Sequence, residues 1–285
     1  MKRALTGILL GLCLGFHAAS YATDAKKISI GVNSWAENIA VANMWKILMA
    51  EKGYTVKLEN ASKIILYNSV ALGKIDVTFE VWLPAADSAP YQSIKDKVQL
   101  IGPWLNEANL GLAVPDYVDI KSIDELNARK DKFTWRGKAS IFGIDAGSGI
   151  MGLTDKALVD YSLDYTLIQS SEAAMLQSLD RAVKRKEPIV VTLWKPHWIW
   201  AKQKLRYLDD PQKTYGTTDA IHSIAARSFK HDHPEAERWL QKWKMDEKSL
   251  GELMATINEN GSSTPEKGAH VWIEANRPLV NGWMN

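Results

Sequence analysis

The sequence predicts an α/β protein of two lobes, each built around a largely parallel sheet. Residues 27–82 alternate between extended apolar runs and helical stretches at the spacing typical of a strand–helix–strand–helix–strand unit. A second alternation of this kind occupies residues 115–217. The helical stretches that close the chain are free to return to the first unit. We therefore expect a first lobe at 28–114 plus 218–285 and a second lobe at 115–217.

Apolar periodicity, and the residues that interrupt it, define the elements of the first lobe. The predicted elements are strands at 27–32, 54–58, 75–82, 98–101 and 110–114, and helices at 37–52 and 63–72. The first helix ends at Gly53. The third strand ends before Pro84, because proline cannot continue a strand ladder.

The second lobe is predicted in the same way. A helix at 122–130 begins at Ser122, with Glu125 as its capping-box partner. The run Ile189–Leu193 is apolar and largely β-branched, as in a buried strand of a parallel sheet, and a following proline ends it close to Trp194. The remaining elements of the chain are strands at 140–144, 165–168, 205–208 and 220–225, and helices at 151–160, 172–186, 234–244, 246–259 and 265–283.

The first 22 residues have the pattern of a cleaved secretory signal. A basic start precedes an uncharged apolar run at residues 4–16, and Ser20–Ala22 places small residues where a signal peptidase reads them. The apolar run is shorter than the about 20 residues that a transmembrane helix needs. We therefore expect a secreted chain that starts near Thr23.

Charge and cysteine content narrow the class of partner. The only cysteine, Cys13, lies in the signal segment, so the mature chain fits an oxidising compartment without depending on disulfides. The full sequence has 35 basic and 33 acidic residues, and removal of Lys2 and Arg3 with the signal segment leaves 33 of each. This balance gives no reason to expect nucleic acid or an acidic membrane surface as a partner.

Twelve tryptophans are the compositional oddity, and three of them follow predicted strand ends: Trp35, Trp82 and Trp194. Ligands of open α/β sheets bind outside the carboxyl ends of the strands. A desolvated indole face attracts a cation by about 2 kcal/mol, and several faces suit a methylated ammonium, which has no hydrogen bond to donate. A single tryptophan at a strand end more often packs under a loop. Trp239, Trp243 and Trp272 lie in amphipathic helical stretches, and we expect them in the core.

Three indole faces would contribute about 6 kcal/mol if they were additive. A micromolar complex needs about 8 kcal/mol, so another group must hold the far end of the ligand. Ser148, Gly149 and Ile150 precede a predicted helix, where free N–H groups and the helix dipole favour a carboxylate or phosphate. The alternative is an ordinary turn that Ser148 caps.

Catalytic motifs are absent from the sequence. It has no Gly-x-Ser-x-Gly elbow, no cysteine nucleophile outside the signal segment, no His-Glu-x-x-His and no Walker-type loop. His231 and His233 are the one close histidine pair, and we expect a solvated loop there rather than a metal site. A paired-carboxylate site stays open, since it needs no fixed spacing. We expect no enzyme, no metal and no cofactor.

Five stretches spread over the chain carry a more specific signal: Val81–Pro84, Gly143–Met151 with Leu153–Lys156, Trp194–Trp198, Leu205–Pro211 and Tyr215–Gly216. In these stretches the chain resembles the substrate-binding proteins of ABC transporters for glycine betaine, choline and related quaternary amines. The resemblance implies a periplasmic binding protein fold, in which two parallel-sheet α/β lobes close on the ligand about a hinge. It also implies a periplasmic monomer whose partners are membrane permease and ATPase subunits.

The resemblance implies roles for the candidate residues. Trp35, Trp82 and Trp194 would form an aromatic cage around a trimethylammonium group, with Trp194 closing from the lobe opposite to the other two. The N–H groups of Gly149 and Ile150 would fall where betaine binders hold the carboxylate.

Two departures leave the far end of the ligand open. Asp87 stands where some betaine binders have a histidine, and an aspartate there repels a carboxylate unless it is hydrogen-bonded or protonated. Glu37 stands where choline binders can carry an acid for the hydroxyl, although the helix dipole alone would favour an acid there. A second hypothesis is another amino acid or a polyamine as cargo, and a third is an enzyme acting on choline-like esters.

Overall fold

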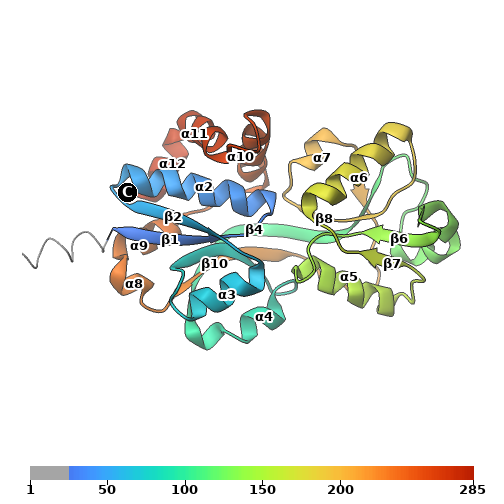
Figure 1. The fold of residues 1–285 in the computed structure, drawn as a ribbon, viewed down its shortest axis with the longest axis horizontal. Helices are drawn as coiled ribbons and strands as arrows, with labels where there is room; N and C mark the ends of the chain where they lie inside the picture. Colours follow the sequence, from blue (N-terminus) through green and yellow to red (C-terminus); the bar gives the residue numbers. More distant parts are fainter. Residues whose placement is uncertain (1–25) are drawn as a thin grey trace, which may run out of the picture.

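The structure is a computed structural model and describes residues 26–285. Two lobes lie side by side along the long axis, and strands run from one lobe into the other (Figure 1). The two-lobed α/β architecture is therefore as predicted. The predicted signal segment, residues 1–22, lies outside the described residues. Within residues 26–285, no helix is both long enough and apolar enough to span a bilayer.

The first lobe has a five-stranded sheet with helices on both faces. Its strand order is β2 (Thr55–Asn60), β1 (Lys27–Val32), β3 (Val77–Leu83), β10 (Asp219–Ala226) and β4 (Val98–Pro115). One face carries α2 (Ala36–Glu51), which packs against α10 (Glu247–Glu259) and α11 (Pro265–Ala275) from the end of the chain (Figure 1). The other face carries α3 (Lys63–Ala71) and α4 (Ser88–Gln92). The tail thus returns to the first lobe.

The second lobe is smaller. Its strands are β5 (Thr134–Trp135), β6 (Lys138–Phe142), β7 (Thr166–Ile168), β8 (Val191–Lys195) and β9 (Leu205–Tyr207). Its helices are α5 (Gly149–Asp160), α6 (Glu172–Arg185) and α7 (Ile199–Lys202). The remaining helices are η1 (Lys95–Lys97), η2 (Ile123–Glu125), η3 (Asn127–Phe133), α8 (Phe229–Asp232), α9 (Pro234–Lys242) and α12 (Arg277–Met284).

Strand direction is mixed rather than purely parallel. The pairs β1–β2, β1–β3, β6–β7 and β6–β8 are parallel, as expected of the two strand–helix units. By contrast, β10 runs antiparallel to β3 and β4, and β4 runs antiparallel to β8 and β9. Among these strands, β4 connects the lobes, because it pairs with β10 in the first lobe and with β8 and β9 in the second.

One 18-residue strand, β4, replaces the two short strands predicted at 98–101 and 110–114. Gly102 and Pro103 look like breakers in the sequence, but irregular register along β10 accommodates them, and pairing continues on both sides. β4 pairs with β10 up to Ala108 and with β8 from Asn109 onward. Because both lobes share this strand, the boundary after residue 114 stays a prediction.

Two predicted helices are also wrong in detail. The segment 122–130 forms two short 3₁₀ helices, η2 and η3, although the capping box of Ser122 and Glu125 is present. The segment 265–283 is two helices, α11 and α12, because α12 starts afresh with a proline in its first turn.

The surplus of tryptophan is partly explained by the core of the first lobe. Trp239, Trp243 and Trp272 are buried, as predicted from their amphipathic helices. Trp243 stacks on Trp104 with ring centroids 4.4 Å apart, and the Trp45 ring contacts Trp243 edge-on with centroids 5.4 Å apart. These indoles pack the returning tail against the sheet, whereas Trp35, Trp82 and Trp194 lie at the pocket.

Candidate functional site

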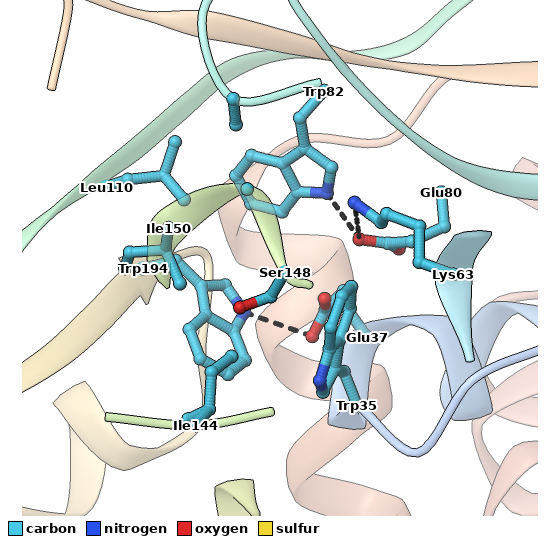
Figure 2. A pocket seen from close by; sticks show the side chains of 12 residues that line it. Trp35, Glu37, Lys63, Glu80, Trp82, Leu110, Ile144, Ser148, Ile150 and Trp194 are labelled. Atoms are coloured by element: carbon cyan, nitrogen blue, oxygen red, sulfur yellow. Dashed lines mark hydrogen bonds and ion pairs between the residues drawn. The ribbon is translucent and has the colours of Figure 1, made fainter. Parts of the chain in front are cut away.

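A pocket of about 280 Å³ lies where the two lobes meet (Figure 2). Its walls are formed by Trp35, Glu37, Lys63, Glu80, Trp82, Ala86, Leu110, Ile144, Ser148, Gly149, Ile150 and Trp194. The three tryptophans singled out at strand ends are all among them, and so are Glu37, Ser148, Gly149 and Ile150. Asp87 is not. Seven residues predicted from the sequence thus line one pocket, and their roles toward a ligand stay a prediction.

Two indole walls belong to the first lobe. Trp35 lies between β1 and α2, and its backbone N–H donates to Asn33 Oδ1 at 3.1 Å. Trp82 lies near the end of β3, and its backbone N–H donates to Asp87 Oδ2 at 2.8 Å. Both side chains are buried, and Figure 2 shows them on different sides of the same space.

The third wall, Trp194, comes from the second lobe near the end of β8, opposite Leu110 of β4. Its indole Nε1 donates to Glu37 Oε2 at 3.0 Å. From behind, Trp200 Nε1 donates to the carbonyl of Trp194 at 2.8 Å, and the His197 ring meets the Trp194 indole edge-on at 4.9 Å. The orientation of Trp194 is thus fixed by contacts on both lobes.

The first turn of α5 closes the pocket from the second lobe. Ser148 Oγ donates to the carbonyl of Asp145 at 2.9 Å and makes no capping hydrogen bond to the helix. The N–H groups of Gly149 and Ile150, the first residues of α5, have no acceptor within the helix. They lie at the positive end of the helix dipole, so this corner of the pocket favours an anionic or acceptor group.

Only glycine fits at position 149. A Cβ atom there would lie 2.5 Å from the carbonyl oxygen of Ala86, which belongs to the loop after β3 in the first lobe. That loop is held by the carboxylate of Asp219, which accepts the N–H groups of Ala85 at 2.6 Å and Ala86 at 3.0 Å. The backbones of the two lobes are therefore in close contact beside the anion-favouring corner.

Two carboxyl groups line the opposite side of the pocket. Glu37 and Glu80 are both buried, and the Trp82 indole N–H donates to Glu80 Oε1. Burial raises the pKa of Glu37 well above the ordinary carboxyl value, and the charges of Glu80 and Glu172 add to this. Burial also raises the pKa of Glu80 to about 7, although the Lys63 ammonium opposes that rise. Near neutral pH the pair therefore retains protons.

Lys63, at the start of α3, is 4% exposed. Its Nζ lies 2.6 Å from Asp87 Oδ2, 4.0 Å from Glu80 Oε1 and 4.8 Å from the centroid of the Trp35 ring. Asp87 also accepts the hydroxyl of Tyr67 at 3.0 Å. Its charge is thus neutralised behind the pocket wall, and any influence of Asp87 on ligand choice, which stays a prediction, would act through Lys63.

Lys63 and Glu80 are the charged pocket residues that sequence reasoning missed, and Ala86, Leu110 and Ile144 are the apolar ones. Glu80 stands two residues before Trp82 in an otherwise apolar strand, so the period of two places both on one face of β3. This position in the strand is the sequence pattern that could have identified Glu80. No sequence pattern identifies Lys63, because only its contact with Asp87, 24 residues further along the chain, shows its place in the structure.

Three consecutive residues at the start of α2 contact the second lobe. Trp35 Nε1 donates to Asp145 Oδ2 at 3.0 Å, the Ala36 N–H donates to Glu172 Oε2 at 2.9 Å, and Glu37 accepts from Trp194. Glu172 is itself held by His197 Nε2, 3.0 Å from its other oxygen. A carboxylate from one lobe thus caps a helix of the other, where the dipole favours an anion. The lobes are closed on each other.

The histidine pair makes no site with other ligands. The His231 ring contacts Asp232 at the surface, whereas His233 is buried against Tyr54 and Phe229. Within residues 26–285, no group of three or more His, Cys, Asp or Glu side chains is arranged to hold a metal ion.

Two lobes joined by crossing strands, with an aromatic-walled pocket between them, define a two-lobed solute-binding protein. Residues 26–275 match the family model of the substrate-binding domain of the ABC-type glycine betaine transport system. The chain belongs to this family, which confirms the resemblance inferred from its motifs. The family consists of substrate-binding proteins of transporters and is not an enzyme family.

Individual relatives agree with this assignment. The glycine betaine/carnitine transport binding protein GbuC of Listeria monocytogenes is 42% identical over 149 residues, which is 51% of the chain and 49% of that relative. The chain thus matches about half the length of this curated relative.

Two solved structures are similar over 91% of the chain. Lactococcal OpuAC in its closed-liganded conformation with glycine betaine is 33% identical, with a TM-score of 0.84 over 100% of that chain. The glycine/betaine/L-proline-binding protein ProX from Borrelia burgdorferi is 32% identical, with a TM-score of 0.86 over 97% of that chain. The periplasmic binding protein fold is thereby confirmed.

Proposed function

We propose that the protein captures a quaternary ammonium compound between its lobes and delivers it to the permease of an ABC transporter. The compound is glycine betaine, choline or a related betaine such as carnitine. The observation that carries this proposal is the convergence of three buried indoles from both lobes on one pocket. Such faces attract a bulky cation that cannot satisfy a carboxylate by donating a hydrogen bond.

In the proposed complex, Trp35, Trp82 and Trp194 surround the trimethylammonium group. The N–H groups of Gly149 and Ile150 bind the carboxylate or other polar end, with the Ser148 hydroxyl beside them. The free N–H groups at the start of α5 support this orientation, because they offer donors to an anion.

The relatives support the class of ligand and the partners. Their names mention glycine betaine, carnitine and L-proline, and the family description mentions an ABC-type transport system. We infer that the partners of this chain are a membrane permease, which receives the ligand, and the ATPase subunits of the same transporter. We also infer that residues 1–22 direct the chain to the periplasm, where it acts as a monomer.

Titration of the purified protein with glycine betaine, choline, carnitine and proline betaine tests the proposal. We expect at least one of them to bind with a micromolar or lower dissociation constant by calorimetry, because the cage and the α5 corner together can supply the about 8 kcal/mol required. Spermidine and free amino acids should not compete. Absence of binding below the millimolar range for all four compounds would refute the function.

An enzymatic role on choline-like esters has less support. The pocket holds two buried carboxyl groups but no serine–histidine or cysteine–histidine pair among its lining residues. Incubation with acetylcholine-type esters should therefore give no turnover above the uncatalysed rate.

Replacing Glu172 with alanine is expected to weaken ligand binding about tenfold, because the Ala36 N–H would lose a charged acceptor when the lobes close. The residue lies outside the pocket wall, so the effect would act on closure rather than on ligand contact. Calorimetry gives the affinity, and small-angle scattering with and without ligand gives the degree of closure.

Glu187→Ala is the matched control, because this glutamate just after the same helix has a side chain that is 57% exposed. It should bind as the wild type does. Equal affinity of the Glu172→Ala and Glu187→Ala variants would show that the interlobe cap contributes nothing to closure.

A further inference from the structure

The carboxyl groups of Glu37 and Glu80 form a pair that the proposed function does not yet use. Glu37 comes from α2 and Glu80 from β3, and both line the pocket beside the indole walls (Figure 2). Both carboxyl groups are buried at this wall, where an ionised carboxylate is costly unless a counter-charge or a proton offsets it. Glu80 Oε2 is buried and has no hydrogen-bond donor among the described residues, which favours a proton on this carboxyl group.

The groups around the pair do not cancel its charge. Lys63 of α3 is the nearest cation, but its Nζ is 2.6 Å from Asp87 and 4.0 Å from Glu80, so it is committed mainly to Asp87. Tyr67 of the same helix also donates to Asp87, and Glu172 of α6 adds a further negative charge near Glu37. The indole N–H groups that reach the pair, from Trp82 and Trp194, are neutral.

We propose that the Glu37–Glu80 pair selects ligands by charge through proton exchange. A ligand that carries only a positive charge expels one proton from the pair to solvent and takes its place as the counter-charge. A zwitterionic betaine brings its own carboxylate and binds without net proton exchange. This inference rests on the proposed function, since it concerns ligands held in the same cage.

The direction of the pH dependence follows from the state of the pair. Below its pKa of about 7 Glu80 is protonated, and above it Glu80 is ionised, while burial and the charges of Glu80 and Glu172 also raise the pKa of Glu37. A bound monocation stabilises the ionised form and lowers the pKa of Glu80 in the complex. Its affinity should therefore rise with pH through neutrality, and proton release should be largest below and near the free-state pKa.

Calorimetric titration of the wild-type protein with choline and with glycine betaine tests this inference. Choline should bind about tenfold more tightly at pH 8 than at pH 6, as one released proton requires, and glycine betaine should change by less than about twofold. At pH 7, where Glu80 is about half protonated in the free protein, the choline enthalpy should differ between phosphate and MOPS buffers by the amount that corresponds to about half a released proton. The glycine betaine enthalpy should not.

Glu80→Gln provides the second arm. Glutamine keeps the size of the side chain and an acceptor for the Trp82 indole but cannot ionise. We expect this variant to lose the pH dependence of choline affinity and, at pH 8, to lose about tenfold more affinity for choline than for glycine betaine. Glu235→Gln, at an exposed site on α9, is the control and should keep the wild-type pH dependence.

The outcomes are distinct. If both ligands bind and release equal numbers of protons, or none, the proton-exchange inference is wrong while the proposed function stands. If neither ligand binds, the proposed function itself fails. Since the wild-type titrations already separate these results, poor folding of Glu80→Gln would not decide the matter.

Discussion

Trp194→Ala should bind quaternary amines at least about thirtyfold more weakly than the wild type, which corresponds to the about 2 kcal/mol of one desolvated indole face. The loss should exceed that value rather than fall below it, because the indole also donates to Glu37 across the lobes. The fold should survive, since the buried side chain lines the pocket and its truncation enlarges a space that is already present. Calorimetry and thermal unfolding without ligand measure the two effects separately.

Two further variants sharpen this result. Trp194→Phe keeps an aromatic face but has no N–H for Glu37, so its affinity should lie between those of the wild type and the alanine variant. Trp135→Ala removes a tryptophan that is 38% exposed and does not line the pocket, and it should bind normally. Normal binding by Trp194→Ala would exclude the cage.

Gly149→Ala is expected to lower affinity by about tenfold or more, a loss typical of forcing a methyl group into a closely packed contact. The added Cβ would meet the Ala86 carbonyl oxygen at 2.5 Å, but only when the lobes are closed. The backbone N–H of residue 149 is unchanged, so the variant separates closure from anion binding. Ligand-induced compaction in small-angle scattering should be reduced.

The same helix offers a matched control in Gly152→Ala. A Cβ at Gly152 has no neighbour within 4 Å, so this variant gains the helix preference of alanine without a clash. It should bind normally and unfold at the same or a higher temperature. If Gly149→Ala binds as well as Gly152→Ala does, the close approach at Ala86 is not needed for the bound state.

The parts of the fold that follow local patterns were predictable. Strand–helix alternation gave both lobes, and the indoles at strand ends converge because the ends of such strands face the same crevice. The long strand β4 escaped prediction because Gly102 and Pro103 read as breakers, and only pairing with a strand more than 100 residues away holds the segment extended.

The electrostatics of the site were not predictable from the sequence. The position of Asp87 indicated a residue facing the ligand, but a buried ammonium from another element holds it behind the wall. The sequence allowed two roles for Glu37, an acid favoured at the start of a helix or a contact to the ligand. Its burial near Glu80 and Trp194 arises only when both lobes are assembled. Such pairings depend on tertiary contacts that carry no local signature.

The start of α2 bears on how fast a ligand leaves. Trp35, Ala36 and Glu37 each hold the second lobe through a different bond, and all three sit on one rigid helical turn. Opening must therefore break these bonds together with those to the ligand, in one step rather than one after another. Ligands that fit the pocket differently should then differ mainly in residence time, with similar rates of association.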